Sequence, residues 1–132
     1  MSYRIHPQQL ENVFSLSSKE RYEHFIIKVC DWQEVWFLAA PNESFLTIKV
    51  DDTNEYVPVW PHKEYALAFA KNTYSSYLPS SMGIDKFVEE FLPKINDSSL
   101  NIGTLPNLET TVWSIKPEDL RDELIAELEE HE

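Results

Sequence analysis

The twelve residues from Glu55 to Ala66 read EYVPVWPHKEYA and join a strand-forming run to the start of a helix. Valine, tyrosine and tryptophan favour extended backbone, whereas the alanines that follow favour a helix. A proline such as Pro61 is tolerated in a first helical turn, so we expect a helix of about ten residues from that point. Pro58 cannot donate to a sheet ladder, which predicts that its strand lies at a sheet edge or carries a bulge.

Before this stretch the sequence predicts two helices and two strands. A helical pattern runs over Pro7–Phe14, with its apolar residues on one face. The segment Ser17–Glu20 has the pattern of a capping box and predicts a second helix that continues to about Asp31. Residues 35–39 and 44–50 are rich in strand formers and are separated by a short turn, so we expect an antiparallel hairpin.

After this stretch the pattern changes twice more. The serine and proline content of Asn72–Met82 predicts a loop. Ile84–Leu92 is amphipathic and predicts a helix that ends near Pro93. Two short strands are expected over residues 101–105 and 110–115, and a last helix follows from about residue 117.

The predicted order is therefore two helices, three strands, two helices, two strands and one helix, or ααβββααββα. Because the strands come in groups, this order favours an α+β fold with a mainly antiparallel sheet of about five strands and about five helices. A length of 132 residues is typical of a single domain, here residues 1–132.

Catalytic and cofactor signatures are missing from the sequence. With only two glycines, Gly83 and Gly103, no phosphate-binding loop and no nucleophile elbow can be formed. One cysteine, Cys30, excludes an internal disulfide and paired-cysteine metal sites, and the histidines are scattered, at His6, His24, His62 and His131. We therefore predict no cofactor, no metal and no enzymatic activity, although distant carboxylates that meet in the fold remain an alternative.

The net charge of −12 argues against a nucleic-acid or anionic-membrane partner. We find neither a signal-peptide pattern nor an apolar stretch of membrane-spanning length, so we expect the cytoplasm. Much of the charge is local, since the segment Glu118–Glu132 has eight carboxylates against one cation, Arg121. These carboxylates either form a solvated helix face or a surface for a basic partner, with Glu123, Glu127 and Glu130 as candidates.

Aromatic residues gather at the junction between the strand and the helix of the opening stretch. Trp60, His62 and Tyr65 lie there, and Trp36 is the candidate to join them. They are either core residues or a recognition surface, because tryptophan and tyrosine serve in both. The second interpretation predicts that at least one of Trp36, Trp60 and Tyr65 lines a concave surface.

Four blocks of the chain occur in an order that resembles a family of small bacterial proteins of unknown function. They are Trp32–Trp36, the V-P-V-W-P and Y-A block, the phenylalanine helix Phe87–Pro93, and the closing Pro117–Leu120. The resemblance covers nearly the whole chain and implies an α+β fold in the bacterial cytoplasm. It implies no activity and no functional residues.

The leading functional hypothesis is a non-enzymatic protein-binding module, of the adaptor, regulator or immunity-protein type, with another, basic protein as its partner. The alternative is a small-ligand binder or a metal-independent enzyme with a cleft near the first sheet, around His62. A homodimer through an exposed strand edge is a third hypothesis, which Pro58 would limit on its own side.

Overall fold

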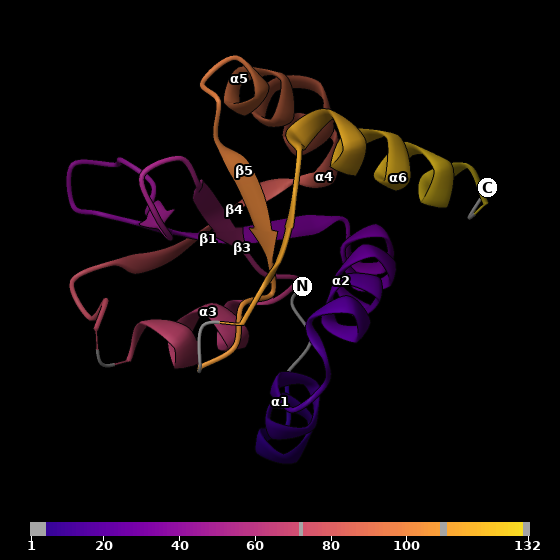
Figure 1. The fold of residues 1–132 in the computed structure, drawn as a ribbon. Helices are drawn as coiled ribbons and strands as arrows, with labels where there is room; N and C mark the ends of the chain where they lie inside the picture. Colours follow the sequence, from indigo (N-terminus) through magenta and orange to yellow (C-terminus); the bar gives the residue numbers. More distant parts are fainter. Residues whose placement is uncertain (1–4, 72, 109–110, 131–132) are drawn as a thin grey trace.

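The structure is a computed structural model that describes residues 5–71, 73–108 and 111–130 (Figure 1). Helices and strands are mixed along the chain, as predicted for an α+β protein. In chain order the elements are α1 (Pro7–Phe14), α2 (Ser18–Trp32), β1 (Glu34–Ala39), β2 (Ile48–Lys49), β3 (Glu55–Val59), α3 (Lys63–Ala70), β4 (Leu78–Gly83), α4 (Ile84–Lys86), the π-helical η1 (Phe87–Phe91), α5 (Leu92–Asn96), β5 (Asn101–Thr104), β6 (Trp113–Ile115) and α6 (Pro117–Glu130).

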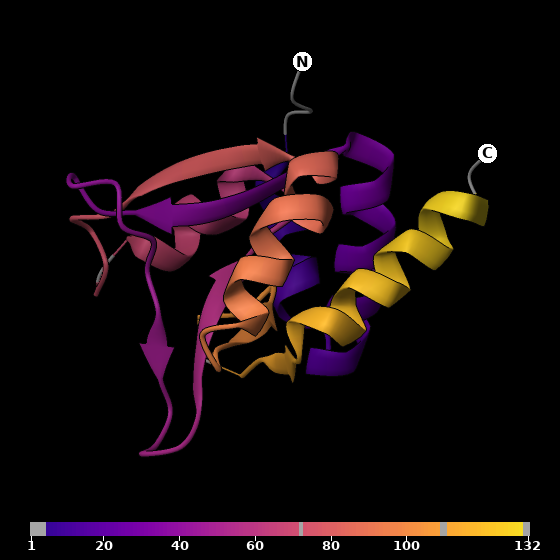
Figure 2. The same ribbon diagram turned by 90° about the horizontal axis from the view of Figure 1, so that it is seen from above.

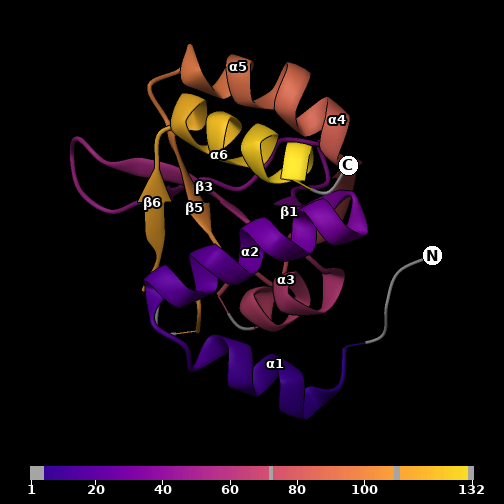
Figure 3. The same ribbon diagram turned by 90° about the vertical axis from the view of Figure 1, so that its right-hand side faces the viewer.

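The strands form two sheets, one of strand order β2-β3-β5-β6 and one of β1 with β4. Only β3 and β5 are parallel, so the prediction of a mainly antiparallel α+β fold is confirmed. A single antiparallel bridge joins the sheets, because Trp36 and Trp60 exchange both backbone hydrogen bonds at 2.8 Å. Helices α5, α6 and α2 lie side by side on the helical side of the molecule (Figures 2 and 3).

The predicted hairpin forms only next to its turn, where Ala39 bridges Phe45 and the Leu46 N–H donates to the Leu38 carbonyl at 2.8 Å. β1 pairs along its whole length with β4, in the segment predicted to be a loop. Pro79 is tolerated there because β4 lies at a sheet edge. Residues 44–50 contribute only β2 and one bridge, Ala39 to Phe45. Pairing with β1 therefore overrides the weak strand propensity of β4.

Pro58 does not mark an edge strand, since β3 lies between β2 and β5. On the β2 side, Tyr56 pairs with Ile48 and Trp60 forms the bridge to Trp36. Pro58 falls between these two positions. Because backbone groups alternate in direction along a strand, its nitrogen, which carries no hydrogen, points toward the same side. A central strand accommodates the proline because its partners on that side are interrupted there.

The helix from Ile84 does not end near Pro93 but continues to Asn96. A proline in a regular α-helix clashes with the carbonyl four residues earlier. Here the chain widens into the π-helical turn η1 before Pro93, and the Leu92 N–H donates to the Phe87 carbonyl five residues back. The wide turn lets the helix pass the proline.

Helix α2 starts as the sequence predicts. The Ser17 hydroxyl accepts from the Glu20 N–H at 3.2 Å, and the Glu20 carboxylate accepts from the Ser17 N–H at 3.1 Å. Its buried face, with Phe25 and Val29 among its residues, packs on the core beside Leu120 of α6. In the part of the chain that the structure describes, none of the helices has the length and apolar character required to span a bilayer.

Candidate functional site

The aromatic residues singled out in the sequence belong to the core. Trp60 and Tyr65 are both 0% exposed, so both side chains lie inside the core. The Trp60 indole packs on Phe69 with ring centroids 5.1 Å apart and donates to the Pro106 carbonyl at 3.4 Å. Tyr65 meets the ring of Phe14 edge-on at 5.6 Å. The bridge to β1 places this junction at the centre of the molecule, which explains its burial.

The two remaining candidates of this group also have structural contacts. His62 is 5% exposed and caps α3, with Nδ1 accepting from the Glu64 N–H at 3.1 Å. Trp36 is half-buried, packs against the core and meets Trp60 through the backbone. None of Trp36, Trp60 and Tyr65 lines either of the two concave surfaces that follow.

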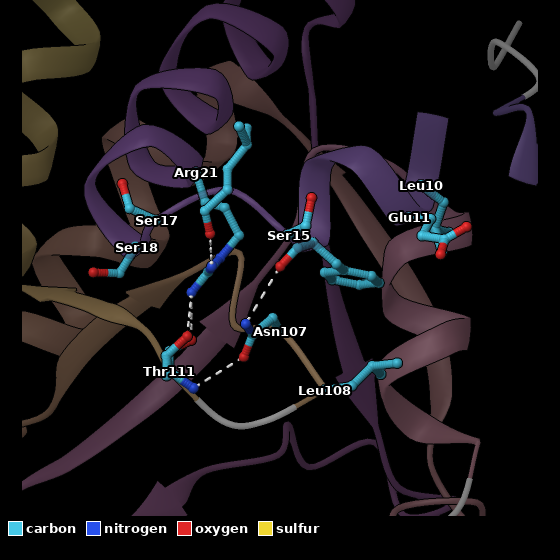
Figure 4. Close-up of a pocket in the computed structure, with 11 residues that line it drawn as sticks. Leu10, Glu11, Ser15, Ser17, Ser18, Arg21, Asn107, Leu108 and Thr111 are labelled. Carbon is cyan, nitrogen blue, oxygen red and sulfur yellow. Dashed lines mark hydrogen bonds between the residues drawn. The ribbon is translucent and has the colours of Figure 1, made fainter. Parts of the chain in front are cut away.

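The first concave surface is a cleft of about 820 Å³ between α1, the start of α2 and the three residues Asn107, Leu108 and Thr111 (Figure 4). We call it the Arg21 cleft. Apolar and polar side chains alternate around it, and its lining comprises Leu10, Glu11, Phe14, Ser15, Leu16, Ser17, Ser18, Arg21, Asn107, Leu108 and Thr111.

Arg21 lies in the wall of the Arg21 cleft and is only 1% exposed. Its guanidinium donates to the carbonyls of Leu105 at 2.8 Å and Leu16, and to both oxygens of Thr111 at 2.7 and 2.8 Å. All of these acceptors are neutral oxygens, and burial lowers the pKa of the guanidinium. Arg21 therefore ties the turn between α1 and α2 to the connection between β5 and β6.

Asn107 completes the same attachment. Its side-chain N–H₂ donates to the Phe14 carbonyl at 3.3 Å, and its side-chain oxygen accepts from the Thr111 N–H at 3.0 Å (Figure 4). Arg21 is not among the candidate residues that the sequence predicts. The available signal was its place one helical turn before Phe25, on the apolar stripe of α2, where a cation needs buried acceptors.

The second concave surface is a groove of about 450 Å³ where β6 leads into α6. We call it the acidic groove, and it is lined by Ile115, Asp119, Asp122 and Glu123. Tyr22 of α2 lies beside it, and its buried hydroxyl has no hydrogen-bond partner in the described part of the chain. Burial, followed by the charges of Glu123 and Asp119, raises the pKa of Tyr22 to about 12.

An exposed tryptophan adjoins the acidic groove. Trp113 of β6 is 37% exposed and stacks on Tyr22, with ring centroids 5.7 Å apart and an interplanar angle of 29°. Trp113 and Ile115 lie on the same side of β6, because side chains two residues apart share a face of a strand. The aromatic pair and the carboxylates therefore form one continuous surface.

The three carboxylates predicted for a partner surface differ in their surroundings. Glu123 and Glu130 are exposed, whereas Glu127 is half-buried and close enough to Cys30 to raise the pKa of its thiol. The one cation of α6, Arg121, is half-buried and donates from Nε to the Val88 carbonyl at 3.2 Å. The exposed charges of α6 are consequently all negative.

The described residues bring no three histidine, cysteine, aspartate or glutamate side chains together in a metal-binding arrangement. Fold and surfaces together define a small α+β protein whose described residues form a polar cleft and an acidic groove. A family model described as "Protein of unknown function (DUF2750)" matches residues 22–124, and the chain belongs to this family. No curated protein and no solved structure matches the chain.

Proposed function

We propose that this protein is a non-enzymatic, cytoplasmic binding module whose acidic α6 surface recognises a basic surface of another protein. The observation that carries the proposal is the set of exposed carboxylates on α6, whose one cation, Arg121, is half-buried and donates to the Val88 carbonyl. Exposed carboxylates such as Glu123 and Glu130 therefore dominate the charge of the helix surface.

A surface of one sign accelerates encounter with a partner of the opposite sign and makes the association sensitive to salt. This behaviour suits an adaptor, a regulator or an inhibitor that covers a basic protein. The salt dependence of binding also provides the test, because exposed charges more than about 10 Å apart are screened at 0.1 M salt.

The experiment compares capture of partners from native lysate at low and at moderate salt by three proteins. They are the natural chain, Glu123→Gln/Glu130→Gln on α6, and Glu43→Gln/Asp52→Asn in the loops around β2, which lie far from α6 (Figure 2). Both variants remove two exposed carboxylates. We expect a stoichiometric partner that moderate salt releases, that the α6 variant loses and that the loop variant retains. Capture that is indifferent to salt and to both variants would exclude the proposal.

Small-ligand binding is a second candidate function, favoured by the size of the Arg21 cleft. A volume of about 820 Å³ is in the range of small-molecule sites, and Ser15, Ser17 and Ser18 are among the residues that line it. The cleft lies at α1 and α2, away from the predicted position around His62. A metabolite that raises the unfolding temperature of the natural chain but not of Ser18→Leu would support this function.

A further inference from the structure

The outer edge of β6 presents backbone groups to solvent. The Leu105 N–H donates to the Val59 carbonyl at 2.8 Å, so this backbone position faces β3. Alternation then turns Thr104 toward β6, where it pairs with Trp113. Ser114 lies between Trp113 and Ile115, whose backbone groups face β5. Its own N–H and carbonyl must therefore point away from β5. Ser114 is exposed and β6 is the last strand of its sheet (Figure 3).

This edge adjoins the aromatic pair and the acidic groove. Trp113 and Ile115 flank Ser114 along the strand and share one face of it. Tyr22 stacks on Trp113, while Ile115 lines the acidic groove with three carboxylates. We define the β6 edge site as Tyr22, Trp113, Ser114, Ile115, Asp119, Asp122 and Glu123.

We infer that the β6 edge site is a docking site for an extended, basic segment of a partner protein. The segment adds a strand beside β6, through the backbone of Ser114, and directs lysine or arginine side chains over Trp113 and into the acidic groove. This inference rests on the proposed function and names the chemistry of its partner.

Three properties of the site argue for this occupant. Strand addition to an exposed edge obtains affinity from main-chain hydrogen bonds and specificity from alternate side chains. The side chains on one face of an added strand recur every second residue, which matches the positions of Trp113 and Ile115. A cation above a tryptophan ring is attracted by its π-electrons, and Asp119 and Glu123 supply the opposite charge beside it.

The same charges disfavour a second copy of this chain as the occupant. Pairing of two β6 strands would bring two acidic grooves, each with Asp119, Asp122 and Glu123, next to each other. Like charges in juxtaposition oppose association. A homodimer through this edge is thus the weaker alternative, and the test includes it.

The test measures fluorescence anisotropy of a labelled peptide of about nine residues, the length of a long strand, in which lysine and threonine alternate. A peptide of glutamate and threonine tests charge. A lysine–threonine peptide that is N-methylated at alternate residues keeps its charge but loses the N–H groups of one edge. We expect the unmodified lysine peptide to bind at least about tenfold more tightly than either comparator.

Variants of the protein locate the binding. Ser114→Pro removes the outward N–H without removing a donor to β5, and Asp122→Asn/Glu123→Gln removes two charges of the acidic groove. Each should weaken binding about tenfold, whereas Glu43→Gln/Asp52→Asn should leave it unchanged. Thermal unfolding checks that each variant is folded. If Ser114→Pro does not fold, the N-methylated peptide still tests strand addition on the natural chain.

Other outcomes overturn the inference in distinguishable ways. Equal binding of the N-methylated peptide refutes strand addition but leaves the acidic surface of the proposed function intact. Equal binding of the glutamate peptide refutes a basic occupant, and the salt-dependent capture then decides the proposed function separately. A dimer that light scattering detects and Ser114→Pro dissociates would replace the basic segment with a second copy.

Discussion

The ring of Tyr56 lies against the α-carbon of Gly103, so closely that a Cβ on Gly103 would be 2.2 Å from Tyr56 Cδ2 and 2.5 Å from Cε2. The two residues belong to the parallel neighbours β3 and β5. The aromatic ring thus occupies the space that a side chain on β5 would need, and only glycine allows the strands their observed spacing.

Gly103→Ala should therefore lower the free energy of unfolding, by about 1–3 kcal/mol, because the ring or the strand must move. Gly83→Ala is the matched control, since a Cβ there has nothing within 4 Å. It should change stability by less than about 1 kcal/mol. Urea unfolding measures both, and equal effects of the two substitutions would show that the contact with Tyr56 is not tight.

Arg21→Lys should cost about 3 kcal/mol, because an ammonium cannot reproduce the fork that reaches Leu16, Leu105 and Thr111 together. Lys19→Ala, at an exposed position of the same helix, should stay within about 0.5 kcal/mol. Urea unfolding again makes the comparison. A lysine at position 21 that preserves stability would mean that the buried hydrogen bonds contribute little.

The thiol of Cys30 should be unreactive in the folded protein. Burial, followed by the charges of Glu127 and Asp31, raises its pKa to about 11. Two units above the ordinary value leave about a hundredfold less thiolate at pH 8. A colorimetric disulfide reagent should modify the thiol at least about a hundredfold faster in urea than in native buffer. Rapid native modification of one equivalent would contradict its burial.

Tyr65→Phe should stabilise the protein by about 1 kcal/mol at neutral pH, because the Tyr65 hydroxyl is buried without a partner among the described residues. Burial also raises the pKa of Tyr65 to about 12. A raised pKa means that the neutral form stabilises the fold below pH 10, the ordinary tyrosine value, and that this contribution disappears as pH rises toward 12.

The free energy of unfolding of the natural chain should accordingly fall between pH 10 and 12, and that of Tyr65→Phe should fall less steeply. Urea unfolding at several pH values gives both slopes. Tyr77→Phe, at a half-buried ring, is the control for loss of a hydroxyl. An unchanged alkaline slope in Tyr65→Phe would place the cause in other groups.

Helices and strands that are specified by residues close together in the sequence can be predicted from local patterns. The capping box of Ser17 and Glu20 starts α2 because both partners lie within one turn. β4 could not be predicted, because Leu78–Gly83 contains proline, serine and glycine and becomes a strand only through pairing with β1. The path of the chain through Pro93 was missed for a related reason, since the π-helical turn depends on packing as well as propensity.

Surfaces were harder to predict than elements. The same tryptophan chemistry serves cores and interfaces, so Trp60 could not be placed until its bridge to β1 was known. Trp113 was not predicted to be a surface residue, although it is the exposed aromatic residue that adjoins the acidic groove. Whether a strand lies at an edge depends on the order of strands in space, which no local pattern encodes.

The π-helical turn has a consequence for a helix that it precedes by many residues. Because Leu92 N–H is used by Phe87, and Pro93 has no N–H to offer, the Val88 carbonyl has no donor within its own helix. Arg121 supplies that donor. A proline in one helix thereby leaves an acceptor that binds the single cation of another helix, so the position of the positive charge on α6 depends on the backbone of the helix packed against it.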